Sequence, residues 1–177
     1  MRHSVHINDQ ERTLDALPDI ADMRDMVYTP SLVPLAPEVV PDRQDLNTRD
    51  QGGHPTCTGF ALAAVIDHLR KPPNPEEAAS TVMLYAMARL HDDVPGIHHR
   101  GSTLRGALKG FFHNGVCKEK DIPYHTLNPA QLNNWELDPA RAASATDLTL
   151  GAYFRLNHIV NDYHTALNEV GALAVSA

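Results

Sequence analysis

Asp50-Gln51-Gly52-Gly53-His54-Pro55-Thr56-Cys57-Thr58-Gly59-Phe60-Ala61 is the most informative stretch of this chain. Its glycines and proline predict a loop, and the residues that follow predict a helix beginning at Cys57. A thiol at a helix N-terminus lies at the positive end of the helix dipole, which favours the thiolate over the thiol. The side-chain amide of Gln51, six residues upstream, can donate a hydrogen bond to a nearby oxyanion. The stretch therefore predicts a thiol nucleophile with an oxyanion donor beside it.

The same residues resemble the nucleophile region of the papain-like cysteine peptidases, especially the bacterial branch, in which a Thr-Gly-Phe/Asn-Ala run follows the cysteine. The resemblance implies that Cys57 is the catalytic nucleophile. It also implies that Gln51 and the Cys57 backbone N–H stabilise the oxyanion. A lone cysteine before an apolar helix is otherwise a buried core residue, and the Gln51–Cys57 spacing favours the nucleophile interpretation over that one.

Two further segments extend the resemblance, which covers about residues 20 to 177. Gly101-Ser102-Thr103-Leu104 precedes an amphipathic helix and resembles the glycine-lined substrate wall of the family. Asp121-Ile122-Pro123-Tyr124 resembles its Tyr-Pro-Tyr turn. The resemblance implies that substrate binds at Gly53, Gly101 and Ser102, the last two lining the cleft and pairing with extended substrate backbone.

The cysteine content points to a reducing compartment. The chain has only two cysteines, Cys57 and Cys117, which excludes a disulfide framework. Secreted members of the family usually carry a cysteine three residues before the nucleophile, where this chain has His54, and Thr58 replaces a common tryptophan. We expect a cytoplasmic protein in which Cys117 is a structural residue.

Composition excludes several classes of partner. The net charge of −7 argues against a nucleic-acid-binding surface. The sequence contains no run of eighteen apolar residues, so no membrane helix is predicted. The N-terminus lacks the apolar stretch of a signal peptide. No cofactor and no metal are expected. His91-Asp92-Asp93 with His98-His99 could bind a divalent cation, but the spacing matches no zinc pattern and favours a solvated loop.

The predicted fold class is α+β, with a papain-like arrangement. Residues 1–45 are expected to form an extended lead-in, residues 46–146 a helical domain bearing the nucleophile, and residues 147–177 the truncated start of a β-barrel-like domain. The first predicted helix runs from Cys57 to about Arg70, is capped by Thr56 and has a core stripe of Phe60, Ala61, Ala64, Val65 and Leu69. A second helix is predicted over Ala78–His91, and a third is opened by Ser102 or Thr103, closed by Gly115, and has these core residues: Leu104, Ala107, Leu108, Phe111 and Phe112. Helical turns within 128–146, a strand over 148–156, a helix capped by Asn161-Asp162 and closed by Gly171, and a strand over 172–177 complete the predicted elements.

The catalytic histidine is expected outside this sequence. The family's histidine and asparagine lie about 130–150 residues after the cysteine, beyond Ala177. We therefore expect an N-terminal portion that is inactive by itself, with the remaining C-terminal half of the same protein as its partner. The internal candidates are predicted to be structural: His54, His125, His158 and His164.

Three functions fit these observations. The first is a cysteine peptidase acting on peptide or protein substrates through the Cys57 thiolate, Gln51 and a histidine after residue 177. The second is an inactive papain-like module that binds peptides or a partner. The third is a related thiol amidase or transpeptidase. The lead-in can be a structural wrap, which its lack of a long charged helix favours, or an inhibitory segment.

Overall fold

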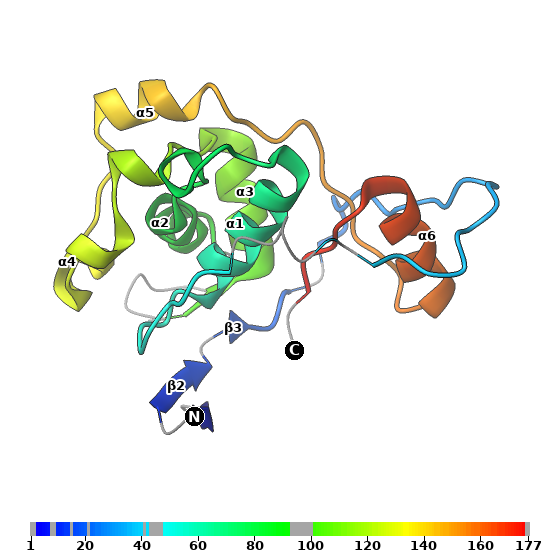
Figure 1. Ribbon diagram of the computed structural model, residues 1–177, viewed down its shortest axis with the longest axis horizontal. Coiled ribbons are helices and arrows are strands. Elements are labelled where there is room, and N and C mark those ends of the chain that lie inside the picture. The colour runs from blue at the N-terminus through cyan, green and yellow to red at the C-terminus, as the bar shows by residue number, and fades with distance from the viewer. Residues whose placement is uncertain are drawn as a thin grey trace.

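Three helices form the centre of the molecule in this computed structural model, which describes residues 3–7, 10–14, 16–20, 22–40, 42, 48–92 and 101–175. They are α1 (Cys57–Arg70), α2 (Thr81–His91) and α3 (Leu104–Asn114). Helix α2 packs against both α1 and α3 (Figure 1). The short helices α4 (Pro129–Asn133) and α5 (Pro139–Ala145) lie on the same body, which confirms the helical turns predicted within 128–146.

Helix α2 is the most deeply buried element, because neighbours cover nearly its whole surface. Its largest fully buried side chains are Val82, Met83, Leu84 and Tyr85, each at most 1% exposed. Glycines on the flanking helices permit close approach. A Cβ at Gly59 of α1 would lie 2.6 Å from the Thr81 carbonyl oxygen, and one at Gly110 of α3 would lie 2.6 Å from Met87 Cβ.

Helix α1 has the predicted bounds, and Phe60 packs against the core as predicted, but most of the predicted core stripe is wrong. Its core face consists of Leu62, Ala63 and Ile66, whereas Ala61, Ala64 and Leu69 are exposed. The helix is apolar on both faces, so periodicity alone could not select the face. Gly59 selects it, because its stripe is the one that fits tightly against α2.

Helix starts were predicted with mixed success. Thr56 does not cap α1 with its side chain, because its hydroxyl is bonded to Tyr124 instead. Helix α2 begins at Thr81 rather than Ala78, since Ser80 accepts a hydrogen bond from Met83 N and caps it there. Asn74 caps a separate 3-10 turn, η2 (Pro75–Glu77), by accepting a hydrogen bond from Glu77 N.

The third helix agrees more closely with its prediction. Thr103 caps α3 by accepting from Gly106 N, and Gly115, at φ +70°, ends it. Leu104, Ala107 and Phe111 are buried as predicted. Phe112, also predicted in the core, is 45% exposed.

The strand predicted over 148–156 does not form. Within the described residues this segment makes a single parallel bridge, between Val27 and Arg155, with Arg155 N donating to Met26 O at 2.8 Å. A strand needs a partner along its length, and the lead-in passes this segment at only one point. Residues 172–175, the described part of the other predicted strand, form no strand either.

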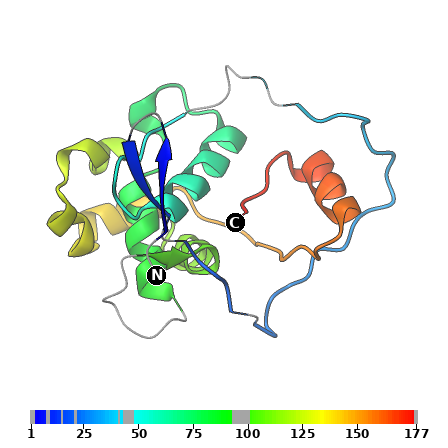
Figure 2. The same ribbon diagram turned by 90° about the horizontal axis from the view of Figure 1, so that it is seen from below.

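Helix α6 (Val160–Val170) lies apart from the central body and ends at Gly171 (φ +87°), as predicted. Asn161 and Asp162 lie inside it rather than capping it, since its N-cap is Ile159. The lead-in runs around this helix (Figure 2). Tyr28 OH donates to Glu169 at 2.5 Å, and Ala36 N donates to Asn168 at 2.8 Å.

The N-terminal residues take part in two small two-stranded sheets. Strand β1 (His3–Ile7) pairs antiparallel with β2 (Gln10–Leu14), a hairpin that the sequence did not indicate. Strand β3 (Ala16–Leu17) pairs in parallel with β4 (Ser102–Thr103), immediately before α3. The α+β class is therefore observed, with helices dominating. Among the described residues no helix is long and apolar enough to cross a bilayer.

Candidate active site at the start of helix α1

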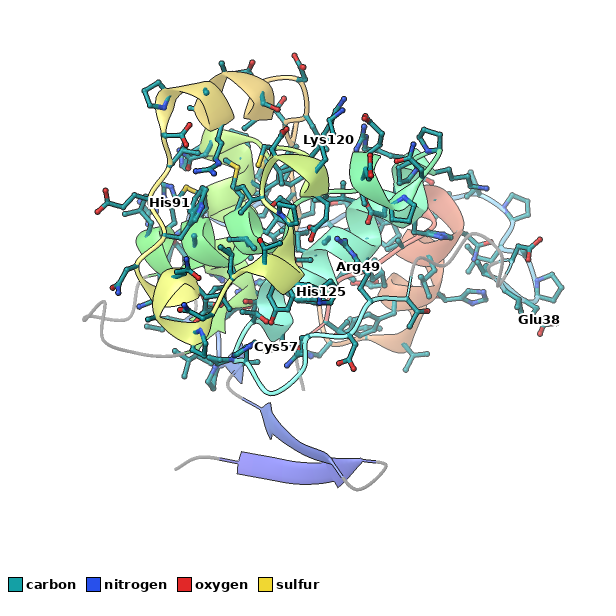
Figure 3. The ribbon with its side chains drawn as sticks, turned by 60° about the vertical axis from the view of Figure 1, so that its left-hand side comes forward. Glu38, Arg49, Cys57, His91, Lys120 and His125 are labelled. Carbon is teal, nitrogen blue, oxygen red and sulfur yellow. The ribbon has the colours of Figure 1, made fainter. Side chains whose placement is uncertain are left out.

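Cys57 is the first residue of α1 and is partly exposed at the edge of the helical body (Figure 3). All residues of this helix are described, and its first turn holds no acidic side chain. The positive end of the helix dipole is therefore not offset by a carboxylate within that turn. The position suits a thiolate that must meet a substrate from solvent.

The second thiol has the opposite environment. Cys117 is fully buried in the core, and this burial raises the pKa of its thiol to about 11. We therefore expect Cys117 to stay protonated at neutral pH and to be a poor nucleophile. The prediction that Cys117 is structural is confirmed.

The loop before Cys57 orders the Gln51 side chain. Gly52 turns the chain at φ +63°, and its N–H donates to Asp50 at 2.8 Å. Gln51 Nε2 donates to the His54 carbonyl at 3.1 Å. A carboxamide has two N–H donors, so this bond leaves one for a further acceptor. Gly53 is exposed, with no atom within 4 Å of where a Cβ would be.

Two residues outside the predicted site hold this loop. Arg49 binds Asp67 at 2.8 Å, the Ala79 carbonyl at 2.9 Å and Glu119 at 3.4 Å. Tyr124 donates its hydroxyl hydrogen to the Gln51 carbonyl at 2.7 Å. The Asp-Ile-Pro-Tyr motif singled out Tyr124 as a turn residue only, and no sequence signal pointed to Arg49.

Gly101 and Ser102 are buried, and Ser102 is only 1% exposed. The Ser102 hydroxyl is hydrogen-bonded to that of Thr58, which joins β4 to the first turn of α1. Strand β4 thus lies beside α1, the helix that begins at Cys57. However, β3 is paired along β4, so a substrate strand cannot occupy that edge while β3 is in place.

The internal histidines have other contacts. His158 Nδ1 lies 3.2 Å from Tyr163 OH, and His164 Nε2 lies 3.0 Å from the Ala36 carbonyl oxygen, both at α6. The rings of His54 and His125 lie edge-on to Tyr124.

The metal alternative finds no support in the described part of the chain, where no three metal-ligating side chains gather. His91 bonds Asn114 at 2.8 Å and stacks on His113, and Asp92 accepts a hydrogen bond from Thr103 N. Asp93, His98 and His99 lie outside the described residues.

Cys57 begins a central helix and follows the loop that carries Gln51, and both lie within part of a papain-like fold. The resemblance to papain-like cysteine proteases is confirmed. The solved structure that shows this is xylellain, a cysteine protease from Xylella fastidiosa. The two share 26% sequence identity at a TM-score of 0.74, over 88% of this chain and 63% of the xylellain chain. No protein-family model and no curated protein sequence matches.

Proposed function

We propose that this chain is the nucleophile-bearing part of a cysteine peptidase. The thiolate of Cys57 attacks the carbonyl carbon of a peptide bond, and the electron pair of the C=O bond moves to oxygen. The Gln51 amide and the Cys57 backbone N–H stabilise that oxyanion. Collapse expels the amine, which takes a proton from an imidazolium, and water then hydrolyses the thioester. In the proposal the imidazole comes from a segment after residue 177.

The observation that carries the proposal is the partly exposed Cys57 at the N-terminus of α1, directly after the ordered Gln51 loop. Similarity to a cysteine protease supports the same chemistry. The chain spans 63% of the xylellain chain, so the activity, substrates and partners of the whole protein are part of the proposal. A cytoplasmic location is proposed as well, supported by two cysteines that form no disulfide.

The proposed substrate is an extended peptide that reaches Cys57 past the exposed Gly53. Backbone pairing of that peptide with Gly101 and Ser102 remains a prediction with one condition. Strand β3 must leave β4 if the substrate uses the edge that β3 now occupies.

The test is peptide cleavage by the intact protein that contains this chain. A library of unstructured peptides, read by mass spectrometry, should yield new termini with the wild type and none with Cys57→Ala. Cleavage that survives in Cys57→Ala contradicts the proposal. Peptide binding without cleavage by either protein indicates the inactive binding module. Products joined to an added amine rather than to water indicate a transpeptidase.

A further inference from the structure

One hydroxyl group spans the loop that leads to the nucleophile. The oxygen of Tyr124 lies 2.7 Å from the Gln51 carbonyl oxygen and 3.0 Å from Thr56 Oγ1. A carbonyl only accepts, so the single tyrosine hydrogen is donated to Gln51. The Thr56 hydroxyl must then donate to the tyrosine oxygen. Gln51 carries the oxyanion donor and Thr56 immediately precedes Cys57, so this hydroxyl bonds the two ends of the loop.

The core holds Tyr124 firmly. It is 5% exposed, and its ring meets the ring of Phe60 edge-on at 4.8 Å between centroids. Its backbone N–H donates to Glu119 at 2.9 Å, and the other carboxylate oxygen of Glu119 contacts Arg49 at 3.4 Å. The hydroxyl is therefore a fixed point, and the loop is placed relative to it.

Burial raises the pKa of Tyr124, so the O–H donor persists well above neutral pH. The Thr56–Tyr124 hydrogen bond is buried and the Tyr124–Gln51 bond is partly buried. A hydrogen bond shielded from water is stronger, and its loss costs more. The same two bonds explain why Thr56 does not cap α1, since its hydroxyl is already engaged.

We propose that Tyr124 is a positioning residue that sets the separation between the Gln51 amide and the Cys57 sulfur. The inference rests on the proposed function, because the separation matters only if an oxyanion forms there. Oxyanion donors act when they are aligned in advance, and a displacement of about 1 Å can cost a hundredfold in rate. In this scheme Tyr124 acts through the loop rather than on the substrate.

The experiment compares two thiol reagents on the intact protein that contains this chain. The Cys57 thiolate adds to the carbonyl carbon of a peptide aldehyde through a new S–C bond while the C=O electron pair moves to oxygen, so the hemithioacetal oxyanion that forms is stabilised by the oxyanion donors. Iodoacetamide forms an S–C bond with loss of iodide and needs none. Tyr124→Phe keeps the ring and removes both hydrogen bonds. We expect its aldehyde affinity to fall about tenfold or more, with the alkylation rate of Cys57 changed less than about twofold.

Two further variants sharpen the comparison. Thr56→Val keeps the Tyr124–Gln51 bond and loses the other, so it should show a smaller loss of aldehyde affinity in the same direction. If Tyr124→Phe does not fold, Thr56→Val alone tests whether these hydrogen bonds position the oxyanion donor. Tyr163→Phe removes a tyrosine hydroxyl at α6, where it contacts His158, and should behave as the wild type.

The outcomes separate the inference from the proposed function. Unchanged aldehyde affinity in Tyr124→Phe and Thr56→Val, or an equal loss of affinity and alkylation, overturns the inference alone. A wild type that is alkylated at Cys57 but takes up no aldehyde also overturns it, because no oxyanion site is then present to be positioned. A wild type that reacts with neither reagent at Cys57 refutes the proposed function and the inference together.

Discussion

At the scale of single residues, surroundings rather than residue type distinguish the two cysteines. Cys57 lies at a helix N-terminus with partial access to solvent, whereas Cys117 is sealed among core side chains beside Met83. A cysteine hydrolase needs a partly exposed thiol such as that of Cys57, whereas a buried thiol such as that of Cys117 packs in the core. The sequence indicated both roles, because the residues around Cys57 carry a motif and those around Cys117 do not.

The thiol of Cys117 should contribute an alkaline limit to stability. Its pKa is raised from 9.0 to about 11 by burial, so between these values the unfolded chain loses the proton while the folded chain keeps it. The contribution of this thiol to the free energy of unfolding is therefore fully present below pH 9.0. It is lost as the pH rises toward 11, which lowers the free energy of unfolding by about 2–3 kcal/mol. Urea unfolding from pH 8 to pH 11 measures the fall. Cys117→Ala should flatten the curve, and an equally steep curve in that variant contradicts the assignment.

Asp67 is a second residue whose role follows from burial. It is 2% exposed and accepts hydrogen bonds from Arg49 and from the Ala79 backbone N–H, both at 2.8 Å. Asp67→Ala leaves a guanidinium and an N–H without this partner, so it should lower the free energy of unfolding by about 3 kcal/mol. Urea denaturation gives the value, and Glu76→Ala, which removes an exposed carboxylate, should change it by less than about 0.5 kcal/mol. Similar losses in the two variants would show that the Asp67 contacts are unimportant.

At the scale of secondary-structure elements, three glycines set how the central helices pack. Gly59, Gly106 and Gly110 face α2 so closely that a Cβ at any of them would lie 2.5–2.6 Å from the nearest atom. The sequence shows these residues only as helix-weakening glycines, since nothing local reveals what lies opposite. The packing reverses the usual preference for alanine within a helix.

Gly59→Ala and Gly110→Ala should therefore destabilise the protein. Alanine ordinarily gains about 1 kcal/mol over glycine inside a helix, but the clash with α2 costs about 1–3 kcal/mol. We expect a net loss of up to about 2 kcal/mol for each variant, measured by thermal or urea unfolding. Gly151→Ala places its methyl in open space and should be nearly neutral. A stabilising effect of alanine at Gly59 would contradict the packing described.

The elements also show where prediction from sequence stops. The bounds of α1 and the caps of α3 follow from local chemistry and were predicted correctly. The core face of α1 and the missing strand at 148–156 depend on partners distant in sequence, so local patterns could not reveal them. At the candidate site the motif predicted Cys57 and Gln51 as a pair; the structure shows Cys57 as the first residue of α1 and Gln51 in the loop before it, and their catalytic pairing stays a prediction. Arg49 and Tyr124 were missed as anchors because their contacts lie 18 to 73 residues away.

At the scale of the whole molecule, the lead-in is bound to α3 as well as to α6. The Arg105 guanidinium pairs with Asp25 at 2.6 Å, both side chains being 8% exposed, and Arg105 N donates to Asp19 at 2.9 Å. These contacts, with the pairing of β3 and β4, keep the lead-in against the side of the body that carries β4. They agree with a wrapping segment, while β3 on the predicted substrate wall keeps the inhibitory alternative open.

Asp25→Ala should loosen this attachment. Asp22 remains 3.8 Å from Arg105, so the loss is expected to be partial, about 1.4 kcal/mol of local stability. Limited proteolysis should then cut residues 22–40 about tenfold faster, since cleavage follows the open population. Glu38→Ala removes an exposed carboxylate of the same segment and should leave the rate unchanged. Equal cleavage rates in Asp25→Ala and the wild type would refute this role for the ion pair.

The most direct measurement is the labelling of the intact protein with a peptidyl epoxysuccinate, followed by peptide mapping. The thiolate opens the epoxide and leaves a stable thioether, so the modified residue is identified by its mass. We expect one adduct, on Cys57, with none in Cys57→Ala and none on the buried Cys117. Labelling of Cys117 equal to that of Cys57, or an unreactive Cys57, would contradict a nucleophilic thiol at the start of α1.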